Sequence, residues 1–384
     1  MSMKDTNKSV VFVLGGLVSG GAERVASHLI NYWYHQGIDV TLIIGHDQSE
    51  DFYSIPEDIN RIVVSNGSPS SNKIIALLKN IPIVWNIRKA LKKTEAQTVI
   101  SFLTRANIYT ILAAAGLKKS VIISERNDTT REEHPWPWPQ LRRMLYNYAD
   151  VVTANSRIAL SGMKEYVHGD KLSIVPNPVY LPEKKAVPSS SKTIINVGRL
   201  VPQKAQHLLI EALALVEKSR RKEWMLNIYG VGEEEENLKR ITKEKGLTDI
   251  VNFRGLVNDI ERVYRGAGIF ILSSKYEGTP NVLLEAMSYG LPCIISDSLA
   301  GALELIENDN NGLVFKSGDA KDLAEKLISL IENPEKRDQL GIQARKQVKN
   351  FTPENVMPVW ENICLLYTSP SPRDQRGSRM PSSA

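Results

Sequence analysis

Short aliphatic and β-branched runs alternate with amphipathic segments along most of the chain, and this alternation restricts the fold more than any other feature. In the first half the runs are VVFVL (10–14), DVTLII (39–44), QTVISF (97–102), SVIISE (120–125), DVVTA (150–154) and KLSIV (171–175). In the second half they are TIINVG (193–198), WMLNIYG (224–230), IVNFRG (250–255), GIFILSS (268–274), PCIISD (292–297) and GLVF (312–315). Strands that are joined by helices form parallel sheets covered on both faces. The pattern therefore predicts an α/β fold.

A stretch rich in proline, serine and charge, at residues 180–192, interrupts this alternation and is typical of a linker. The chain has 384 residues, which is long for a single domain. We expect an N-terminal domain over 1–180, a linker over 181–191 and a C-terminal domain over 192–345. Each half reads as a doubly wound, Rossmann-like domain. The two are predicted to face one another across a cleft, because ligands of such sheets bind at the carboxyl ends of the strands.

The composition is that of a globular protein, with 42% hydrophobic and 24% charged residues. Cys293 and Cys364 form no CxxC and read as ordinary buried thiols of a reducing compartment, with a single disulfide as the alternative. No His/Cys cluster has metal-ligand spacing, so no metal is predicted. The net charge of +5 is modest, and without a matching motif it does not indicate nucleic-acid binding. No apolar run approaches the roughly 20 residues that a membrane-spanning helix needs.

The two chain ends each allow more than one interpretation. Basic residues precede the apolar run at 10–14 and resemble a weak signal peptide, but the run is short and no cleavage site follows, which favours a buried first strand. The C-terminal stretch 368–384 has no periodicity and few residues that could be buried. It reads as read-through of non-coding or adapter sequence, with a native disordered tail as the alternative, and is left out of the fold prediction.

The segment SKYEGTPNVLLEA (274–286) places two carboxylates around a predicted helix start. Thr279 suits the N-cap and Pro280 the first helical position. Glu277 would then lie in the loop above the helix N-terminus, and Glu285 inside the helix. Backbone N–H groups at that end favour an anion such as a diphosphate. A nucleotide sugar fits this layout, because diols lie on both sides of its diphosphate.

Other candidate residues follow predicted strands. GGLVSGGAER (15–24) is neither GxGxxG nor a P-loop, since Ala22 stands where lysine is required, but its paired glycines would let the backbone approach a ligand. A tight turn is the alternative. Arg199 and Lys204 follow the strand at 193–198 and could grip a diphosphate, or form a solvated basic loop. YGVG and FRG, with Gly230, Gly232 and Arg254, are weak signals of a strand followed by a turn.

Taken together, NVGRLVPQK, YGVGEEE, FRGLVND and SKYEGTPNVLLEAMSYGLPCIISD resemble the donor-binding half of family 4 glycosyltransferases, which have the GT-B fold. GGLVSGGAER resembles the first loop of that family. The resemblance runs from about residue 9 to 367. It implies a retaining, metal-independent transfer from a nucleotide sugar, which is a substrate, so no cofactor is expected. A final helix over 346–367 is expected to cross back to the N-terminal domain.

The resemblance also implies roles for individual residues. Arg199 and Lys204 would stabilise the leaving diphosphate, and Glu277, the third catalytic candidate, would hold the donor sugar. Glu285 would accept hydrogen bonds from the ribose diol. The absence of any Asp-x-Asp agrees with a metal-independent reaction. The expected donor-binding residues are Gly20, Gly21, Gly230, Gly232, Arg254, Gly278, Thr279, Pro280, Asn281 and Glu285.

The acceptor side is expected at the first loop and at the segment after the strand at 120–125. The candidates are Gly16, Glu125, Arg126 and Asn127, with a structural ion pair in this loop as the alternative. The pairing of SGGAER with ISERN resembles bacterial enzymes that extend lipid-linked oligosaccharides with hexosamine. The expected reaction is therefore transfer of a hexose or N-acetylhexosamine, from a UDP-sugar, to a lipid-linked oligosaccharide or polysaccharide of the cell surface.

Positive charge is concentrated between residues 72 and 146, where the sequence contains 13 Lys and Arg but only 5 Asp and Glu. Tryptophans and tyrosines lie among these cations, and Trp85, Trp136 and Trp138 are expected at headgroup depth. This mixture suits an anionic membrane surface. Ordinary helices with solvated lysines are the alternative. We expect a cytoplasmic protein that binds peripherally to the inner face of the membrane.

Other functions remain open on the sequence alone. A sugar-nucleotide epimerase of the same fold and a non-catalytic sugar-binding protein are the main alternatives. A phosphorylase would need a lysine-held pyridoxal phosphate and a longer chain. A Rossmann-type oxidoreductase is disfavoured, because the glycines at 15–21 lack its fingerprint.

Overall fold

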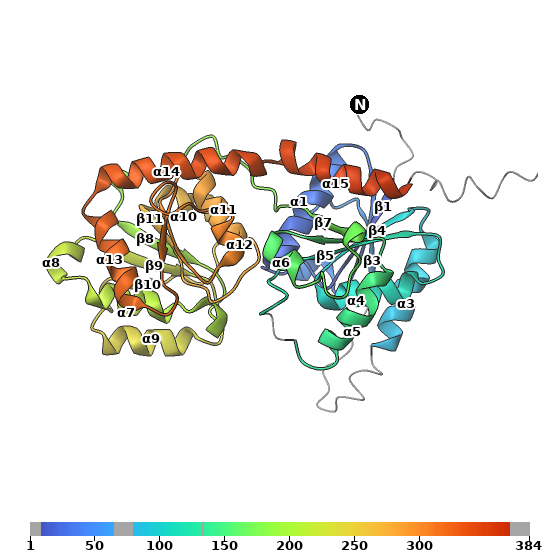
Figure 1. The fold of residues 1–384 in the computed structure, drawn as a ribbon, viewed down its shortest axis with the longest axis horizontal. Helices are drawn as coiled ribbons and strands as arrows, with labels where there is room; N and C mark the ends of the chain where they lie inside the picture. Colours follow the sequence, from blue (N-terminus) through green and yellow to red (C-terminus); the bar gives the residue numbers. More distant parts are fainter. Residues whose placement is uncertain (1–8, 65–79, 132–133, 369–384) are drawn as a thin grey trace, which may run out of the picture. The chain divides into compact units, whose positions relative to one another are not determined.

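The chain folds into two compact units, Met1–Pro176 with Val356–Ala384, and Asn177–Asn355. The computed structural model describes residues 9–64, 80–131 and 134–368, with side chains as far as Cys364. Each unit contains one parallel β-sheet with helices on both faces, which confirms the predicted α/β architecture of two doubly wound sheets (Figure 1). The predicted tail from 369 onward lies outside the described residues.

The first sheet has seven parallel strands in the order β3-β2-β1-β4-β5-β6-β7. They are β1 (Ser9–Leu14), β2 (Asp39–Ile44), β3 (Asn60–Val63), β4 (Thr98–Phe102), β5 (Ser120–Glu125), β6 (Val151–Ala154) and β7 (Leu172–Ile174). Strand β1 is central and buried, as predicted, and pairs with β2 and β4. Strand β3 was not predicted, because this edge strand is only half-buried and carries no apolar run.

Two apolar layers cover the two faces of this sheet. Successive side chains of β1 point to opposite faces, so neighbouring residues of this strand pack into different layers. Phe12 faces α1 (Gly21–His35) and α15 (Pro353–Thr368), where Trp360 is fully buried. Val13 faces the opposite layer. That layer contains α3 (Ile81–Lys93), α4 (Thr104–Ala114), α5 (Trp138–Leu145) and α6 (Arg157–Ser161) (Figure 1). The short helices of the unit are η1 (Gln48–Glu50), η2 (Tyr146–Tyr148) and η3 (Gly169–Lys171).

The second sheet has six parallel strands in the order β10-β9-β8-β11-β12-β13. They are β8 (Thr193–Val197), β9 (Met225–Tyr229), β10 (Val251–Phe253), β11 (Ile269–Leu272), β12 (Cys293–Ser296) and β13 (Leu313–Phe315). The runs predicted as strands in this half all contain one of these strands. Most of their apolar residues are buried, on both faces of the sheet, as expected for a covered parallel sheet.

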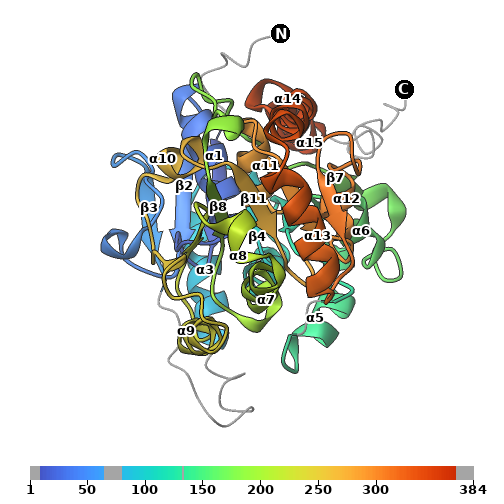
Figure 2. The same cartoon turned by 90° about the vertical axis from the view of Figure 1, so that its left-hand side faces the viewer.

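Helices pack on both faces of the second sheet. One apolar layer includes α7 (His207–Leu215), α9 (Glu235–Glu244) and α13 (Ala320–Ile331). The other includes α10 (Ile260–Arg265), α11 (Asn281–Ser288), α12 (Ala300–Leu303) and the end of α14 (Pro334–Val348). Helices α7 and α13 lie side by side (Figure 2). The remaining short elements are α8 (Lys218–Arg221), η4 (Pro188–Ser190), η5 (Pro202–Lys204) and η6 (Lys349–Phe351).

The structure divides the C-terminal region and the linker differently from the prediction. In place of one helix over 346–367, α14 ends at Val348 and α15 begins at Pro353, after η6. Residues 181–191 belong to the second unit, where the Ala186 N–H donates to the Tyr289 carbonyl at 2.9 Å. This segment is therefore packed onto a domain and does not serve as a loose tether. Both cysteines are free thiols, in agreement with the first of the two interpretations.

Each sheet has a position where the strand order reverses. In the first unit it lies between β1 and β4, and in the second between β8 and β11. Loops at the carboxyl ends of strands beside such a position bind ligands in doubly wound folds. The glycine-rich loop 15–20 follows β1. The segment with Arg199 and Lys204 follows β8, and the segment with Glu277 follows β11.

Candidate functional site

Three hydrogen bonds join the two loops that follow β8 and β11 in the second unit. The Lys275 N–H donates to the Gln203 carbonyl at 2.8 Å, and the Gln203 amide donates to the Tyr276 carbonyl at 2.7 Å. The Ser273 hydroxyl donates to the carbonyl of Lys204 at 2.8 Å. These bonds fix the two loops against each other. Gln203 and Ser273 were missed by the sequence analysis, because nothing in the chain order shows which loops meet.

The joined loops bring Lys204 and Glu277 into direct contact. The Lys204 ammonium Nζ donates to Glu277 Oε1, and the two side chains are only 15% and 10% exposed. Arg199 lies beyond the end of β8 with its side chain exposed, and its carbonyl accepts from the Gln206 amide at 2.9 Å. Lys204 and Glu277 thus form a cation–carboxylate pair at the switch point of the sheet. An anionic ligand here would compete with Glu277 for Lys204.

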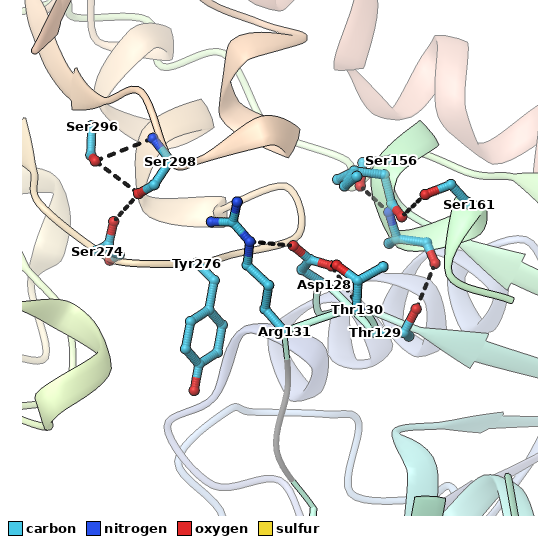
Figure 3. Close-up of polar contacts among 12 residues, drawn as sticks. Asp128, Thr129, Thr130, Arg131, Ser156, Ser161, Ser274, Tyr276, Ser296 and Ser298 are labelled. Atoms are coloured by element: carbon cyan, nitrogen blue, oxygen red, sulfur yellow. Dashed lines mark hydrogen bonds and ion pairs between the residues drawn. The ribbon is translucent and has the colours of Figure 1, made fainter. Parts of the chain in front are cut away.

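A serine cluster supports the start of the β11 loop. The Ser298 hydroxyl lies 2.9 Å from the Ser296 hydroxyl and 3.3 Å from the Ser274 carbonyl, to which it donates (Figure 3). Ser274 is fully buried. The loop that carries Glu277 is therefore held from the β12 side as well as from the β8 side.

Helix α11 begins one residue later than predicted. Pro280 is its N-cap and Asn281 its first residue, so Thr279 is not the N-cap. A proline cannot supply a capping side chain, and this helix start has no side-chain cap bond. The Asn177 amide binds the same segment as a hydrogen-bond donor. It donates to the Thr279 carbonyl at 2.9 Å and to Asn281 Oδ1 at 2.6 Å. Sequence analysis could not find Asn177, which lies about a hundred residues away in the chain.

Glu285 is buried inside α11, and its partner comes from another helix. The Tyr264 hydroxyl of α10 donates to Glu285 Oε2 at 2.8 Å. The Tyr264 ring is stacked on Tyr289, with centroids 5.4 Å apart and an interplanar angle of 22°. The predicted helix therefore contains a carboxylate whose orientation is fixed by a buried tyrosine.

The glycines after β9 are explained by backbone packing. A Cβ on Gly230 would lie 2.0 Å from the Gly198 carbonyl oxygen, and one on Gly232 would lie 2.2 Å from the Leu200 oxygen. Gly278 is approached in the same way, since a Cβ on Gly301 would lie 2.1 Å from its carbonyl oxygen. These contacts account for Gly230 and Gly232 without a ligand. Their donor-binding role stays a prediction.

Arg254 follows β10 and is exposed. Its Nε donates to the Asn227 side chain at 3.2 Å. Asn227 lies on the neighbouring strand β9. This contact anchors the arginine stem near the carboxyl end of β10, and the predicted donor contact stays untested.

In the first unit, the glycine-rich loop is clamped by the segment after β2. The Leu17 N–H donates to His46 Nε2 at 3.1 Å, and the Phe52 N–H donates to the Leu17 carbonyl at 2.9 Å. Asp51 lies 3.2 Å from His46 Nε2 and receives two bonds from Arg61, at 2.6 and 2.8 Å. The loop backbone is thus held in place on both its N–H and its carbonyl side.

The same clamp explains two of the glycines. A Cβ on Gly16 would lie 2.5 Å from the His46 ring, so Gly16 is buried under that ring. A Cβ on Gly20 would lie 2.1 Å from a Glu23 carboxylate oxygen, at the N-cap of α1. Gly21, the first residue of α1, is exposed. A Glu23 carboxylate oxygen thus lies next to Gly20 at this helix start, and the donor-binding role of Gly20 and Gly21 stays a prediction.

The acceptor candidates at the end of β5 differ in burial. Glu125 is buried and accepts from the Thr104 hydroxyl at 2.9 Å and from the Tyr146 hydroxyl. Burial, then the charge of Glu125 and its hydrogen bond, raise the pKa of Tyr146 well above its usual value, so the hydroxyl stays protonated. Asn127 is half-buried. These contacts give Glu125 a structural role, and its acceptor role stays a prediction.

Arg126 lies between two aromatic rings of the first unit. Its guanidinium carbon is 5.2 Å from the centroid of Phe102 and 5.3 Å from that of Trp360 on α15. One nitrogen donates to the Val175 carbonyl at 3.0 Å. Burial lowers the pKa of Arg126 to about 9, which still leaves it charged at neutral pH. Arg126 thus joins the β5 loop to the C-terminal helix.

The loop after Arg126 is shaped by Asp128. Its carboxylate accepts from the backbone N–H of Thr130 at 2.9 Å and from the Thr130 hydroxyl, and lies 3.9 Å from Arg131 Nε (Figure 3). The Thr129 hydroxyl donates to the Ala159 carbonyl at 3.1 Å. This segment is a structured turn.

Among the residues that the structure describes, no group of His, Cys, Asp and Glu side chains could hold a metal ion.

Both halves of the chain match known families. Residues 19–181 match the family described as Glycosyltransferase Family 4, and residues 181–347 match Glycosyl transferases group 1. An uncharacterized glycosyltransferase of Haemophilus influenzae is 29% identical over 359 residues, which cover 92% of this chain and 98% of that protein.

Two further proteins are similar over nearly the whole length. A Campylobacter jejuni α-1,4-N-acetyl-D-galactosaminyltransferase, named for the acceptor GalNAc-α-(1→4)-GalNAc-α-(1→3)-diNAcBac-PP-undecaprenol, is 28% identical over 356 residues. The match covers 91% of this chain and 96% of that enzyme. The crystal structure of Anabaena HepE in complex with UDP and glucose has a TM-score of 0.79 at 19% identity, covering 93% of this chain and 99% of that one.

The two family matches meet at residue 181 and together cover residues 19–347, which include every strand of both sheets except β1. The solved structures share the arrangement of two parallel, doubly wound sheets. With the acidic pair of residues 277 and 285 placed as the sequence predicted, in a loop and in the helix after it, the chain belongs to the family 4 glycosyltransferases and has the GT-B fold.

Proposed function

We propose that the protein is a retaining, metal-independent hexosyl- or N-acetylhexosaminyltransferase. It uses a UDP-sugar and extends a lipid-linked oligosaccharide or polysaccharide on the inner face of the bacterial cytoplasmic membrane. The observation that carries the proposal is the Lys204–Glu277 contact at the β8–β11 switch point, in the same unit as the buried Glu285. The named acceptor of the Campylobacter relative, an undecaprenol-linked glycan, supports the acceptor class.

The proposed chemistry follows from where charge develops. When the bond between sugar and diphosphate breaks, negative charge grows on the departing diphosphate. Arg199 and Lys204 are the cations at the end of β8 and would stabilise it. The N-terminus of α11 adds backbone N–H groups, whose partial positive charge would also favour the diphosphate. As Lys204 turns to the diphosphate, Glu277 is released to accept hydrogen bonds from the hydroxyls of the donor sugar.

We expect Glu285→Gln and Glu277→Gln to impair binding in different ways. Glu285→Gln should weaken UDP and UDP-sugar alike, by roughly tenfold or more, because a charged hydrogen bond to the ribose is worth about 1.5–3 kcal/mol. Glu277→Gln should leave UDP binding within about twofold and weaken the UDP-sugar. Calorimetric titration of both ligands measures this. Equal losses for both ligands in both variants would exclude the division of roles.

The reaction itself needs a separate measurement. Incubation with a panel of UDP- and GDP-sugars, with and without an undecaprenyl-diphosphate-linked glycan, should give nucleotide release that depends on acceptor. A transferase produces an extended glycan with retained anomeric configuration. Epimerised sugar nucleotide without acceptor, or binding without turnover, would point to the epimerase or the non-catalytic protein.

The proposal includes a membrane surface on the first unit, formed by the outward face of α3. Ile81 and Trp85 are 62% and 61% exposed, and Lys89, Lys92 and Lys93 are exposed on the following turns. Lys89 Nζ lies 5.4 Å from the centroid of the Trp85 ring. An exposed tryptophan next to lysines suits the headgroup region of an anionic bilayer. No helix within the described ranges is long and apolar enough to cross a membrane.

The structure corrects one detail of the predicted membrane face. Trp136 is exposed, but Trp138 is buried against Tyr109 and does not reach the surface. Arg88 donates to the carbonyls of Ala113 and Ala115 at the end of α4, at 2.8 and 2.6 Å, so its charge is used within the fold. Part of the basic region, residues 72–79 and 132–133, lies outside the described residues.

We expect Lys89, Lys92 and Lys93 to support vesicle binding. Replacing all three with Gln should lower the partition coefficient onto vesicles rich in anionic lipid roughly 10²-fold in a sedimentation assay, because each lysine near such a surface contributes about 1 kcal/mol. The same change at Lys239, Lys243 and Lys245, exposed lysines of the second unit, is the matched control. If the wild-type protein stays wholly in the supernatant at low salt, the proposed membrane-binding role of α3 is wrong. The proposed transferase activity is unaffected by that result.

A further inference from the structure

A buried tyrosine of α10 is bonded to the carboxylate of α11, and neither the sequence motif nor the family matches assign it a role. The Tyr264 hydroxyl donates to Glu285 Oε2 at 2.8 Å, and both side chains are buried, at 0% and 6% exposure. The Val282 carbonyl is 3.5 Å from the same hydroxyl, at the limit of a hydrogen bond. Of these two acceptors, Glu285 is the closer to the hydroxyl.

The Tyr264 ring cannot easily change position. It is stacked on Tyr289 at 5.4 Å and tilted against Phe270 of β11 at 6.4 Å. Its helix, α10, is capped by Asp259, whose side chain accepts from the Arg262 N–H at 3.0 Å. A ring held on two sides by other rings keeps its hydroxyl at one point. That point fixes one carboxylate oxygen of Glu285.

Fixing one oxygen of a carboxylate also fixes the direction of the other. A vicinal diol offers two hydroxyls at a set spacing, so a carboxylate that receives both must face them in one orientation. A carboxylate free to rotate would lose that freedom on binding, which weakens affinity. The hydrogen bond from Tyr264 removes this loss in advance.

We infer that Tyr264 is a positioning residue for the nucleotide: it orients Glu285 toward the 2′,3′-diol of the ribose of a nucleoside diphosphate. The inference rests on the proposed function, in which Glu285 meets the ribose. Beyond that function, Tyr264 would make the site select for a ribose that carries both hydroxyls. Tyr264 would do so only through its effect on Glu285. Tyr264 itself touches no substrate.

The test is a set of calorimetric titrations of the full-length protein with UDP and with 2′,3′-dideoxy-UDP. The variants are Tyr264→Phe, Glu285→Gln, the double variant, and Tyr289→Phe as the matched control. Tyr264→Phe should raise the Kd for UDP roughly tenfold and leave the Kd for dideoxy-UDP within about twofold. The double variant should bind UDP no more weakly than Glu285→Gln alone, since coupled residues are not additive. Tyr289→Phe should preserve the preference for UDP.

The outcomes separate the inference from the proposed function. If the wild-type protein binds UDP and dideoxy-UDP equally, the ribose role of Glu285 fails, and the inference with it. If the wild type prefers UDP and Tyr264→Phe keeps the full preference, Tyr264 has no positioning role although Glu285 does. If Tyr264→Phe loses affinity equally for UDP and for dideoxy-UDP, the inference is also overturned. Such a loss indicates a general change of the pocket and no specific effect on the ribose hydroxyls.

A structure of the wild-type protein with UDP tests the inference without a substitution, should Tyr264→Phe fail to fold. The hydrogen bond between Tyr264 and Glu285 Oε2 should remain below 3.2 Å, with the second carboxylate oxygen on the ribose diol. A complex in which Glu285 meets the ribose after leaving Tyr264 overturns the inference. A complex in which the ribose lies elsewhere overturns the role of Glu285.

Discussion

Replacing Lys204 with Ala is expected to lower kcat by roughly 10²-fold or more at saturating donor, the range found when one group that stabilises transition-state charge is removed. Charge on the diphosphate grows as the bond to the sugar breaks, so the loss should be larger in kcat than in donor affinity. Steady-state kinetics with varied UDP-sugar measures both. Arg199→Ala should act in the same direction.

The contact between Lys204 and Glu277 adds a second effect that can be separated from the first. Without Lys204, the Glu277 carboxylate, 10% exposed, remains as an uncompensated negative charge where an anion must bind. Affinity for UDP, which lacks the sugar that Glu277 would hold, should therefore fall in Lys204→Ala and recover in part when Glu277→Gln is added. The kcat should not recover, because the stabilising cation is still missing.

The control for this prediction is Lys239→Ala. Lys239 lies on α9 of the same unit and pairs with Glu235 and Glu236 at 2.8 and 3.0 Å on the surface. Such exposed pairs contribute little, so its kinetics should match the wild type. A Lys204→Ala variant with near-normal kcat would show that Lys204 does not stabilise the leaving group.

Replacing Gly230 with Ala is expected to destabilise the second unit by at least about 3 kcal/mol. The new Cβ would lie 2.0 Å from the Gly198 carbonyl oxygen, a backbone atom at the end of β8 that cannot rotate away. The residue also has φ of +135°, where side chains are strained. Denaturant unfolding followed by circular dichroism measures the loss.

Gly255→Ala separates strain from collision. Gly255 has φ of +63°, and a Cβ there would meet no heavy atom within 4 Å. Only conformational strain applies, so the loss should stay near 1–2 kcal/mol. Equal losses at Gly230 and Gly255 would contradict the packing explanation for Gly230.

The order of strands and helices was readable from the sequence by itself. Apolar runs of four to seven residues, separated by amphipathic segments, identify buried parallel strands because both faces of such strands must be apolar. The motif SKYEGTPNVLLEA also placed Glu277 in a loop and Glu285 in a helix, as the structure does. Local signals sufficed here, since the spacing between loop and helix lies within a dozen residues.

Boundaries and the edge strand depended on neighbours that the sequence does not show. Strand β3 is half-buried and has no strong apolar pattern, and it forms because β2 offers an open edge. Helix α11 begins at Asn281 and not at Pro280, and the segment before it is held by Asn177, whose side-chain amide donates to the Thr279 carbonyl. Such effects come from residues far away in the chain.

Only the tertiary structure decided which side chains meet. The contact of Lys204 with Glu277 spans 73 positions, and that of Tyr264 with Glu285 spans 21 and joins two helices. The sequence named Lys204, Glu277 and Glu285 by motif, but it offered no reason to single out Tyr264 among 13 tyrosines. Residue type and local spacing determine secondary structure and motifs, whereas partners across loops are chosen by the packing of the sheet, which brings distant strand ends to one edge.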